Sequence, residues 1–168
     1  MSLSYYQLSV PVFLRGLDNL SKLLDKAFEH ATATGMPMEE LLQARLAPDM
    51  YTLIGQVQAV SDSSKLCTAR LAGVTPPSFP DTETTLEQLR ERIANTQAFI
   101  RSVTPEQYEA NAGKTVTLKT SSREMILSQQ DFLLGFAQPN FYFHLTTAYD
   151  ILRHKGVAIG KMDFLGGV

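Results

Sequence analysis

Apolar residues recur at alternating steps of three and four through most of this chain of 168 residues. The first such segment covers residues 4–34. Its apolar positions are Tyr6, Val10, Phe13, Leu17, Leu20, Leu24 and Ala27. Since an α-helix turns once in about 3.6 residues, these side chains share one face, which must be buried against another element. The spacing predicts long helices packed on one another. Pro11 lies inside the segment, and we expect the regular helix to begin at or near it, or to bend there.

Three further segments repeat this spacing. The second, 48–72, is expected to begin at Pro48, with Asp49 in its first turn, because proline loses no hydrogen bond at the first helical position. The third, 84–102, is expected to begin with a capping box of Thr84 and Glu87. Its polar side chains, among them Arg92, are expected to face water. The fourth, 128–156, is expected to be capped by Ser128, kinked at a proline in position 139 and ended by a glycine.

The segments between these helices complete the predicted fold. Residues 73–80 contain three prolines and form a crossover loop. Residues 114–127 alternate apolar and polar side chains around a turn at Thr120–Ser122, which predicts a β-hairpin. The tail, 157–168, carries enough apolar residues to dock on the helices or on a partner subunit. Together these features predict one all-α domain over residues 1–168, a four-helix bundle with a small β-hairpin before the last long helix.

Composition excludes several classes of function. A formal net charge of −2 gives no electrostatic drive toward nucleic acid. No run of residues approaches the about 18 consecutive apolar positions of a membrane span. Cys67 is the one cysteine, and the first residues lack the features of a signal peptide. We therefore expect a cytoplasmic protein with no nucleic-acid or membrane partner.

His144 is the strongest candidate for chemistry. Asn140 precedes it by four residues, so both side chains project from one face of the last helix, toward the predicted interior. An imidazole there can be a structural residue with its hydrogen bonds satisfied, line a ligand pocket, ligate a metal or act as a general base. A carboxamide is a poor metal ligand and does not titrate near neutral pH. Spacing alone leaves these roles of His144 open, and it reveals no strong catalytic motif.

Several blocks of the sequence together resemble a known family. They are Ser4-Tyr5-Tyr6, the VPVFLRGL of residues 10–17, the LAPDM of 46–50, the PNFYFH of 139–144 and the LRHKGV of 152–157. The chain resembles a bacterial domain-of-unknown-function family within the DinB/YfiT-like superfamily of metalloenzymes. The resemblance covers essentially the whole chain. It implies a four-helix bundle with crossover topology, commonly a homodimer.

The resemblance also implies a metal site that this chain has largely lost. Members with a complete site bind a divalent metal through one histidine on the second helix and an HxxxH pair on the last. The second histidine of that pair corresponds to His144 and the first to Asn140. Residues 48–72 contain no histidine, and the polar candidates there are Gln56, Gln58 and Asp62. Because catalytic zinc usually takes three protein ligands, one imidazole predicts a degenerate site.

Three hypotheses follow for the function. The first is a bundle protein with no cofactor that binds a small molecule near His144, Asn140, Gln56 and Gln58. The second is an enzyme dependent on zinc or nickel, a thiol-dependent transferase or a hydrolase-like protein, in which His144 and Asn140 are joined by a carboxylate such as Asp49 or Asp62. The third is a structural homodimer that acts through its helix surfaces and apolar tail.

Overall fold

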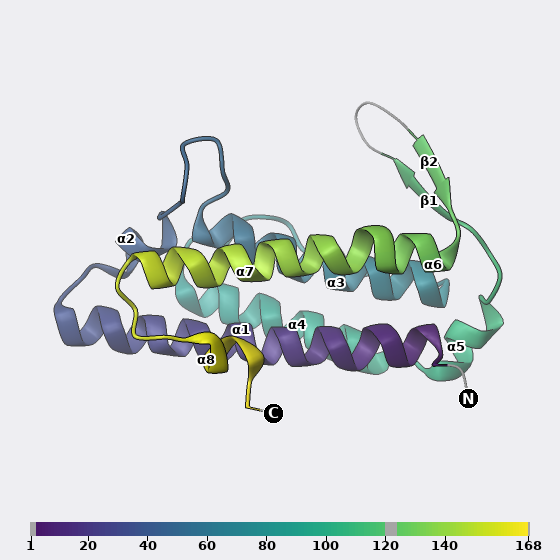
Figure 1. Ribbon diagram of the computed structural model, residues 1–168, viewed down its shortest axis with the longest axis horizontal. Helices are drawn as coiled ribbons and strands as arrows, with labels where there is room; N and C mark the ends of the chain where they lie inside the picture. Colours follow the sequence, from purple (N-terminus) through teal and green to yellow (C-terminus); the bar gives the residue numbers. More distant parts are fainter. Residues whose placement is uncertain (1–2, 120–123, 168) are drawn as a thin grey trace.

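The computed structural model describes residues 3–119 and 124–167. Four long helices lie side by side: α1 (Tyr5–Thr34), α3 (Leu53–Ala72), α4 (Leu86–Ser102) and α7 (Gln138–His154) (Figure 1). The shorter helical elements are α2 (Met38–Leu42), α5 (Pro105–Ala110), α6 (Gln129–Phe132), η1 (Leu133–Ala137) and α8 (Lys161–Leu165). Strands β1 (Val116–Lys119) and β2 (Glu124–Leu127) form one antiparallel hairpin. The expectation of a mainly helical chain with a small hairpin before the last long helix is confirmed.

Helix α1 begins well before its proline. Ser4 caps it by accepting a hydrogen bond from the Gln7 amide, and the Gln7 side chain accepts one from the Ser4 amide, which together form a capping box. Pro11 therefore lies inside the helix, so the expected start at or near it is wrong. Both Gln7 and Pro11 are exposed, and the carbonyl group that proline leaves without a donor lies on the water-facing side of the helix.

The second long helix also begins elsewhere than expected. Pro48 and Asp49 lie in a turn closed by a hydrogen bond from the Met50 amide to the Ala47 carbonyl. Helix α3 starts at Leu53, where Thr52 accepts a hydrogen bond from the Gly55 amide at 3.4 Å. The expected start at Pro48 is wrong because proline fits a tight turn as well as it fits a first helical turn.

The cap of α4 lies one residue after the expected one. Thr85 accepts from the Gln88 amide, and the Gln88 side chain accepts from the Thr85 amide. The expected pair of Thr84 and Glu87 does not form this box. Because an amide oxygen can replace a carboxylate as the acceptor, Gln88 serves the same role as the expected glutamate.

The last long helical segment contains a π-helical turn just before its proline, and the kink expected at Pro139 stays a prediction. Leu133–Ala137 form η1, and Pro139 lies in the first turn of α7. A π turn holds one more residue than an α turn, and its carbonyl groups pair with amides five residues on. The wider turn relieves the clash that a proline ring makes with the carbonyl group four residues earlier.

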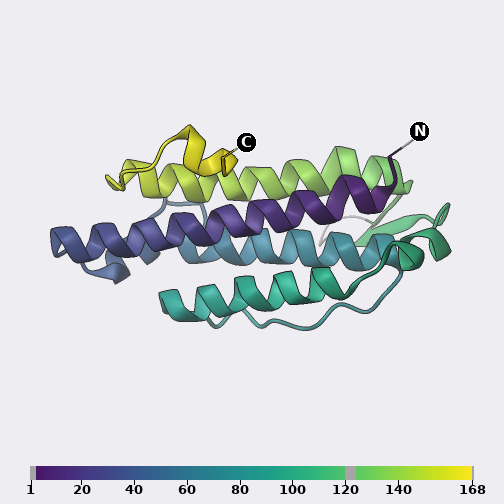
Figure 2. The same cartoon turned by 90° about the horizontal axis from the view of Figure 1, so that it is seen from below.

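The long helices pack around α3 and the large side chains of α1. Helix α3 contacts both α4 and α7. The loop after α3 runs back along the length of α4, so that α3 and α4 begin at the same end of the molecule (Figure 2). Phe13 of α1 and Phe141 of α7 are fully buried, and their ring centroids lie 4.9 Å apart. The antiparallel neighbours α3 and α7 (Figure 1) are the pair from which the candidate site is built.

The hairpin and the tail attach to this core at separate places. Val116 and Leu118 of β1 are buried, and Val116 pairs with Leu127 of β2. The expected turn at Thr120–Ser122 lies outside the described residues. The tail docks on α1, where the Asn19 side chain donates to the Phe164 carbonyl at 2.9 Å. Within the described residues, every helix is too short or too polar to span a bilayer.

Helix α1 approaches α7 closely at Gly16, so adding a side chain there should destabilise the protein. A Cβ atom at Gly16 would lie 2.6 Å from Cζ of the buried Phe141 ring. We expect Gly16→Ala to lower the free energy of unfolding, because overpacking costs about 1–3 kcal/mol and the gain in helix propensity, at most about 1 kcal/mol, offsets part of it. Urea denaturation measures this change. The control is Gly135→Ala, where nothing lies within 4 Å of the added atom. A Gly16→Ala protein as stable as the wild type would contradict this packing.

Candidate functional site

A cavity of about 480 Å³ lies between α3 and the segment formed by α6, η1 and α7. We call it the groove. Its lining residues are Tyr51, Gly55, Gln58, Ala59, Asp62, Ser63, Leu66, Arg70, Asp81, Leu118, Lys119, Phe132, Phe136, Ala137, Asn140 and His144. The residues of α3 in this set recur every three or four positions, so one face of that helix forms one wall. Phe136 and Ala137 of η1 belong to the opposite wall, and β1 contributes Leu118 and Lys119.

His144 is half-buried in α7 and is held by a residue of α3. Its Nδ1 lies 2.8 Å from Oε1 of Gln56, which is 1% exposed. The Gln56 Nε2 donates to the Tyr51 carbonyl at 3.4 Å, and this bond orients the Gln56 amide so that its oxygen faces the imidazole. Because a carbonyl oxygen only accepts, the His144 Nδ1 carries the proton. Nε2 is then the nitrogen of the neutral ring that has a free lone pair.

The surroundings of His144 favour the neutral ring. Burial lowers the pKa of His144 below its ordinary value. The Tyr51 ring stacks on the imidazole with centroids 6.1 Å apart, and the Phe143 ring meets it edge to face at 5.2 Å. At neutral pH the site therefore presents an uncharged imidazole, able to accept a hydrogen bond or a proton at Nε2.

The structure brings together most of the residues that the sequence singled out. His144, Asn140 and Gln58 line the groove, and Gln58 Nε2 donates to Oε2 of Glu83 at 2.9 Å. Gln56 lies behind the imidazole as its partner and does not line the groove. Of the two carboxylates considered, Asp62 lines the groove, whereas Asp49 lies in the exposed turn before α3.

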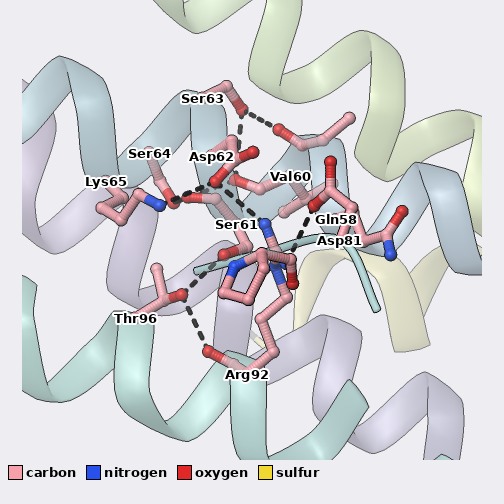
Figure 3. A network of polar contacts seen from close by, with 12 residues as sticks. Gln58, Val60, Ser61, Asp62, Ser63, Ser64, Lys65, Asp81, Arg92 and Thr96 are labelled. Carbon is pink, nitrogen blue, oxygen red and sulfur yellow. Dashed lines mark hydrogen bonds and ion pairs between the residues drawn. The ribbon is translucent and has the colours of Figure 1, made fainter. Parts of the chain in front are cut away.

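A buried arginine supports the α3 wall of the groove. The side chain of Arg92, on α4, is 1% exposed, so the expectation that it faces water is wrong. Its guanidinium contacts Asp62 at 3.0 Å and Asp81 at 3.0 Å (Figure 3). A third carboxylate, that of Glu83, lies 2.9 Å away. Arg92 is buried because it lies three residues after Leu89 and four before Thr96, on the apolar side of the helix.

This network joins α3, α4 and the loop between them. Burial acts to raise the pKa of Glu83, but hydrogen bonds from Gln58 and Arg92 outweigh it, and the pKa of Glu83 lies below its ordinary value. Asp62 is also contacted by Lys65 at 2.8 Å (Figure 3). The carboxylate of Asp62 is therefore shared by two cations, while Gln58 is fixed through Glu83.

The residues around His144 do not fit a catalytic divalent metal. They offer one imidazole, carboxamides at Asn140 and Gln58, and a carboxylate at Asp62 that Arg92 and Lys65 already hold. Among residues 3–119 and 124–167, no group of three or more His, Cys, Asp or Glu side chains is placed to hold a metal ion. Because zinc prefers imidazole, thiolate and free carboxylate ligands, this donor set is too poor for it.

Comparisons with known proteins agree with this structure. The model of a family described as a domain of unknown function, DUF1993, matches residues 5–165. The chain belongs to the DUF1993 family. A crystal structure of a DinB family member from Shewanella denitrificans is similar to it, with a TM-score of 0.90 and 40% sequence identity over 97% of this chain and 92% of that one. The DUF1993 fold thus falls within the DinB-like superfamily, as the resemblance implied. No curated protein matches the chain.

Sequence reasoning missed two residues that line the DUF1993 groove, Tyr51 and Arg70, and the buried Arg92 that supports its α3 wall. Tyr51 precedes α3 by two residues, and only the true helix start places its ring over His144. The burial of Arg92 could have been predicted from its position on the apolar side of α4. Arg70 ends the α3 wall of the groove, at a step of four residues from Leu66, and this signal could have been read from the spacing.

Replacing Arg92 should destabilise the fold far more than replacing Arg90. Arg92→Met leaves the largely buried carboxylate of Glu83 without its cation, and breaking such a buried pair costs about 3–5 kcal/mol. The matched control is Arg90→Met, which removes a partly exposed pair with Asp25 and should cost about 0–1 kcal/mol. Urea denaturation at neutral pH compares the two variants. Equal losses of stability would contradict the structural role of Arg92.

Acid should destabilise the protein through His144. In the unfolded chain its imidazole takes up a proton near pH 6.5, but in the fold its pKa is lower. The unfolded state therefore binds the proton first, and the free energy of unfolding falls as the pH drops from 7 through the lowered pKa. Urea denaturation at about pH 7 and about pH 5.5 measures this in the wild type and in His144→Gln. We expect the wild type to lose more stability; equal losses would contradict the lowered pKa.

Proposed function

We propose that this protein binds a small organic molecule in the groove without the help of a metal ion. The observation that carries the proposal is the neutral His144 imidazole, held by Gln56 in a groove that Asn140 and Gln58 also line. A buried hydrogen bond that fixes one nitrogen and leaves the other with a free lone pair positions the ring for a ligand.

The size and lining of the groove support this function. Ligand pockets usually occupy about 300–1,000 Å³, and the groove has about 480 Å³. Aromatic and aliphatic side chains, including Phe136 and Leu66, offer an apolar surface. A small number of polar groups at defined places provides orientation and specificity.

The polar groups can form complementary hydrogen bonds to a ligand. His144 Nε2 accepts from a hydroxyl or amine, and the Asn140 amide both donates and accepts. Gln58 adds a second carboxamide, whose position Glu83 fixes. Because these groups are uncharged at neutral pH, this end of the groove suits a neutral polar group on the ligand.

We also propose the assembly that the superfamily implies and the cytoplasmic location that the composition indicates. The arrangement of α1, α3, α4 and α7 is consistent with its crossover four-helix bundle. On α7, Phe143 is 58% exposed and Tyr142 37%, and apolar side chains of this kind support a homodimer. A slightly acidic chain with one buried cysteine is consistent with the cytoplasm.

A thermal-shift screen of small polar aromatic compounds tests the proposed function. Compounds that bind near His144 should raise the Tm of the wild type, because a ligand at a hundred times its Kd stabilises a fold by about 2.7 kcal/mol. His144→Ala should reduce these shifts. The matched control is His154→Ala, which alters an exposed histidine at the end of α7, and it should retain the shifts.

Two outcomes would contradict the proposal. The first is that every stabilising compound acts equally on the wild type and on His144→Ala. The second is stoichiometric zinc or nickel in protein purified without a nickel column and its loss in His144→Ala, which elemental analysis detects. That second outcome would favour the metal-dependent enzyme.

A further inference from the structure

Arg70 marks the end of the groove that lies far from His144. It belongs to the last turn of α3, and Gln56, the partner of His144, lies fourteen residues earlier on the same helix. At 1.5 Å per residue this separation is about 21 Å along the helix axis. Since both Arg70 and His144 line the groove, the groove is long enough for an extended molecule.

The guanidinium of Arg70 differs from the buried cations beside the groove. Arg92 and Lys65 are each engaged by carboxylates. Arg70 is half-buried, and it forms no ion pair with any residue in 3–119 or 124–167. Burial lowers the pKa of Arg70, and no carboxylate opposes that effect. A half-desolvated guanidinium of this kind gains most from an acid group on a ligand, which it can bind through two parallel hydrogen bonds.

The surroundings of Arg70 suit an acid attached to an apolar body. The Phe132 ring lies 5.9 Å from its Cζ, and Phe132 stacks with Phe136 at 6.2 Å between centroids. Lys119, also in the groove lining, adds a second positive charge, and its ion pair with Glu124 is exposed on both sides. This end of the groove therefore combines positive charge with an aromatic wall.

The acidic residues of the groove do not neutralise that end. Asp62 and Asp81 both contact Arg92, and Asp62 also contacts Lys65. Asp62 lies eight residues before Arg70, about 12 Å along α3. The charges of the groove are thus separated along its length. Carboxylates bound by Arg92 and Lys65 lie in the middle, and at the end lies Arg70, which has no carboxylate partner among the described residues.

From this separation we propose that the groove binds an elongated organic anion whose carboxylate or phosphate group is bound by Arg70. Its apolar body lies against the exposed ring of Phe136, which the buried Phe132 supports, and an uncharged polar group at its other end reaches Asn140 and His144. The inference rests on the proposed function, and it adds the chemical class of the ligand and the residue that recognises it.

Titration with three simple probes, followed by amide-detected NMR, tests this inference. The probes are hydrocinnamate, its uncharged amide hydrocinnamamide, and phenyl phosphate. Each is titrated into the wild type, Arg70→Met, Arg70→Lys and Arg101→Met. Methionine keeps the apolar stem of arginine without its charge, and Arg70→Lys keeps the charge without the two parallel hydrogen bonds. Arg101 is exposed in the last turn of α4 and serves as the matched control.

We expect at least one acid to shift the amide resonances of groove residues, and to bind the wild type about tenfold or more tightly than hydrocinnamamide does. Arg70→Met should weaken the binding of that acid by a similar factor and Arg70→Lys by a smaller one. Arg101→Met should leave its binding unchanged. The tighter of the two acids identifies a carboxylate or a phosphate as the preferred group. The same spectra show whether each variant is folded.

Two results would overturn the inference. If acids and amide bind the groove equally well, or if Arg70→Met leaves the acids unaffected, the recognition of an anion is wrong while small-molecule binding stands. If neither acid shifts the groove resonances, the inference is also wrong. The proposed function fails with it only when hydrocinnamamide and the compounds of the thermal-shift screen leave the groove unaffected as well.

Discussion

The hydrogen bond between Gln56 and His144 joins α3 to α7 at the place where the groove begins. Both partners depend on it: the imidazole would otherwise be half-buried without an acceptor for Nδ1–H, and the Gln56 oxygen would be buried without a donor. Because a second bond to the Tyr51 carbonyl orients the amide, the choice of tautomer is built into the fold. The chemistry available at His144 therefore follows from the packing of two helices that are distant in sequence.

The distribution of charge along the groove also follows from contacts between elements that are distant in sequence. Arg92 is buried in α4 and binds carboxylates from α3 and from the loop that follows it (Figure 3). This network compensates the acidic side chains and fixes Gln58 through Glu83. Arg70 lies outside the network, at the other end of the same wall. The groove consequently offers an uncharged polar end at His144 and a cationic end at Arg70.

The chain shows which parts of such a site can be predicted from sequence. Periodicity located the long helices, and the spacing of four residues correctly placed Asn140 and His144 on one face, because both signals are local. The starts at Pro48 and Pro11 were wrong because proline fits several local structures. Gln56 and His144 are 88 residues apart in the sequence, and their hydrogen bond depends on how α3 and α7 align. No local sequence pattern predicts that alignment. Arg92 contradicts the expectation that a charged side chain faces water, because its position beside Leu89 and Thr96 puts it on the buried side of α4.

The most direct test of the account is a crystal structure of the wild-type protein soaked with a mixture of small organic fragments. The account predicts fragment density inside the groove, in contact with His144 Nε2 or Asn140 at one end or with Arg70 at the other, and Gln56 bonded to His144 Nδ1. A metal ion coordinated by His144, or a groove filled by its own side chains with no room for a fragment, would contradict it.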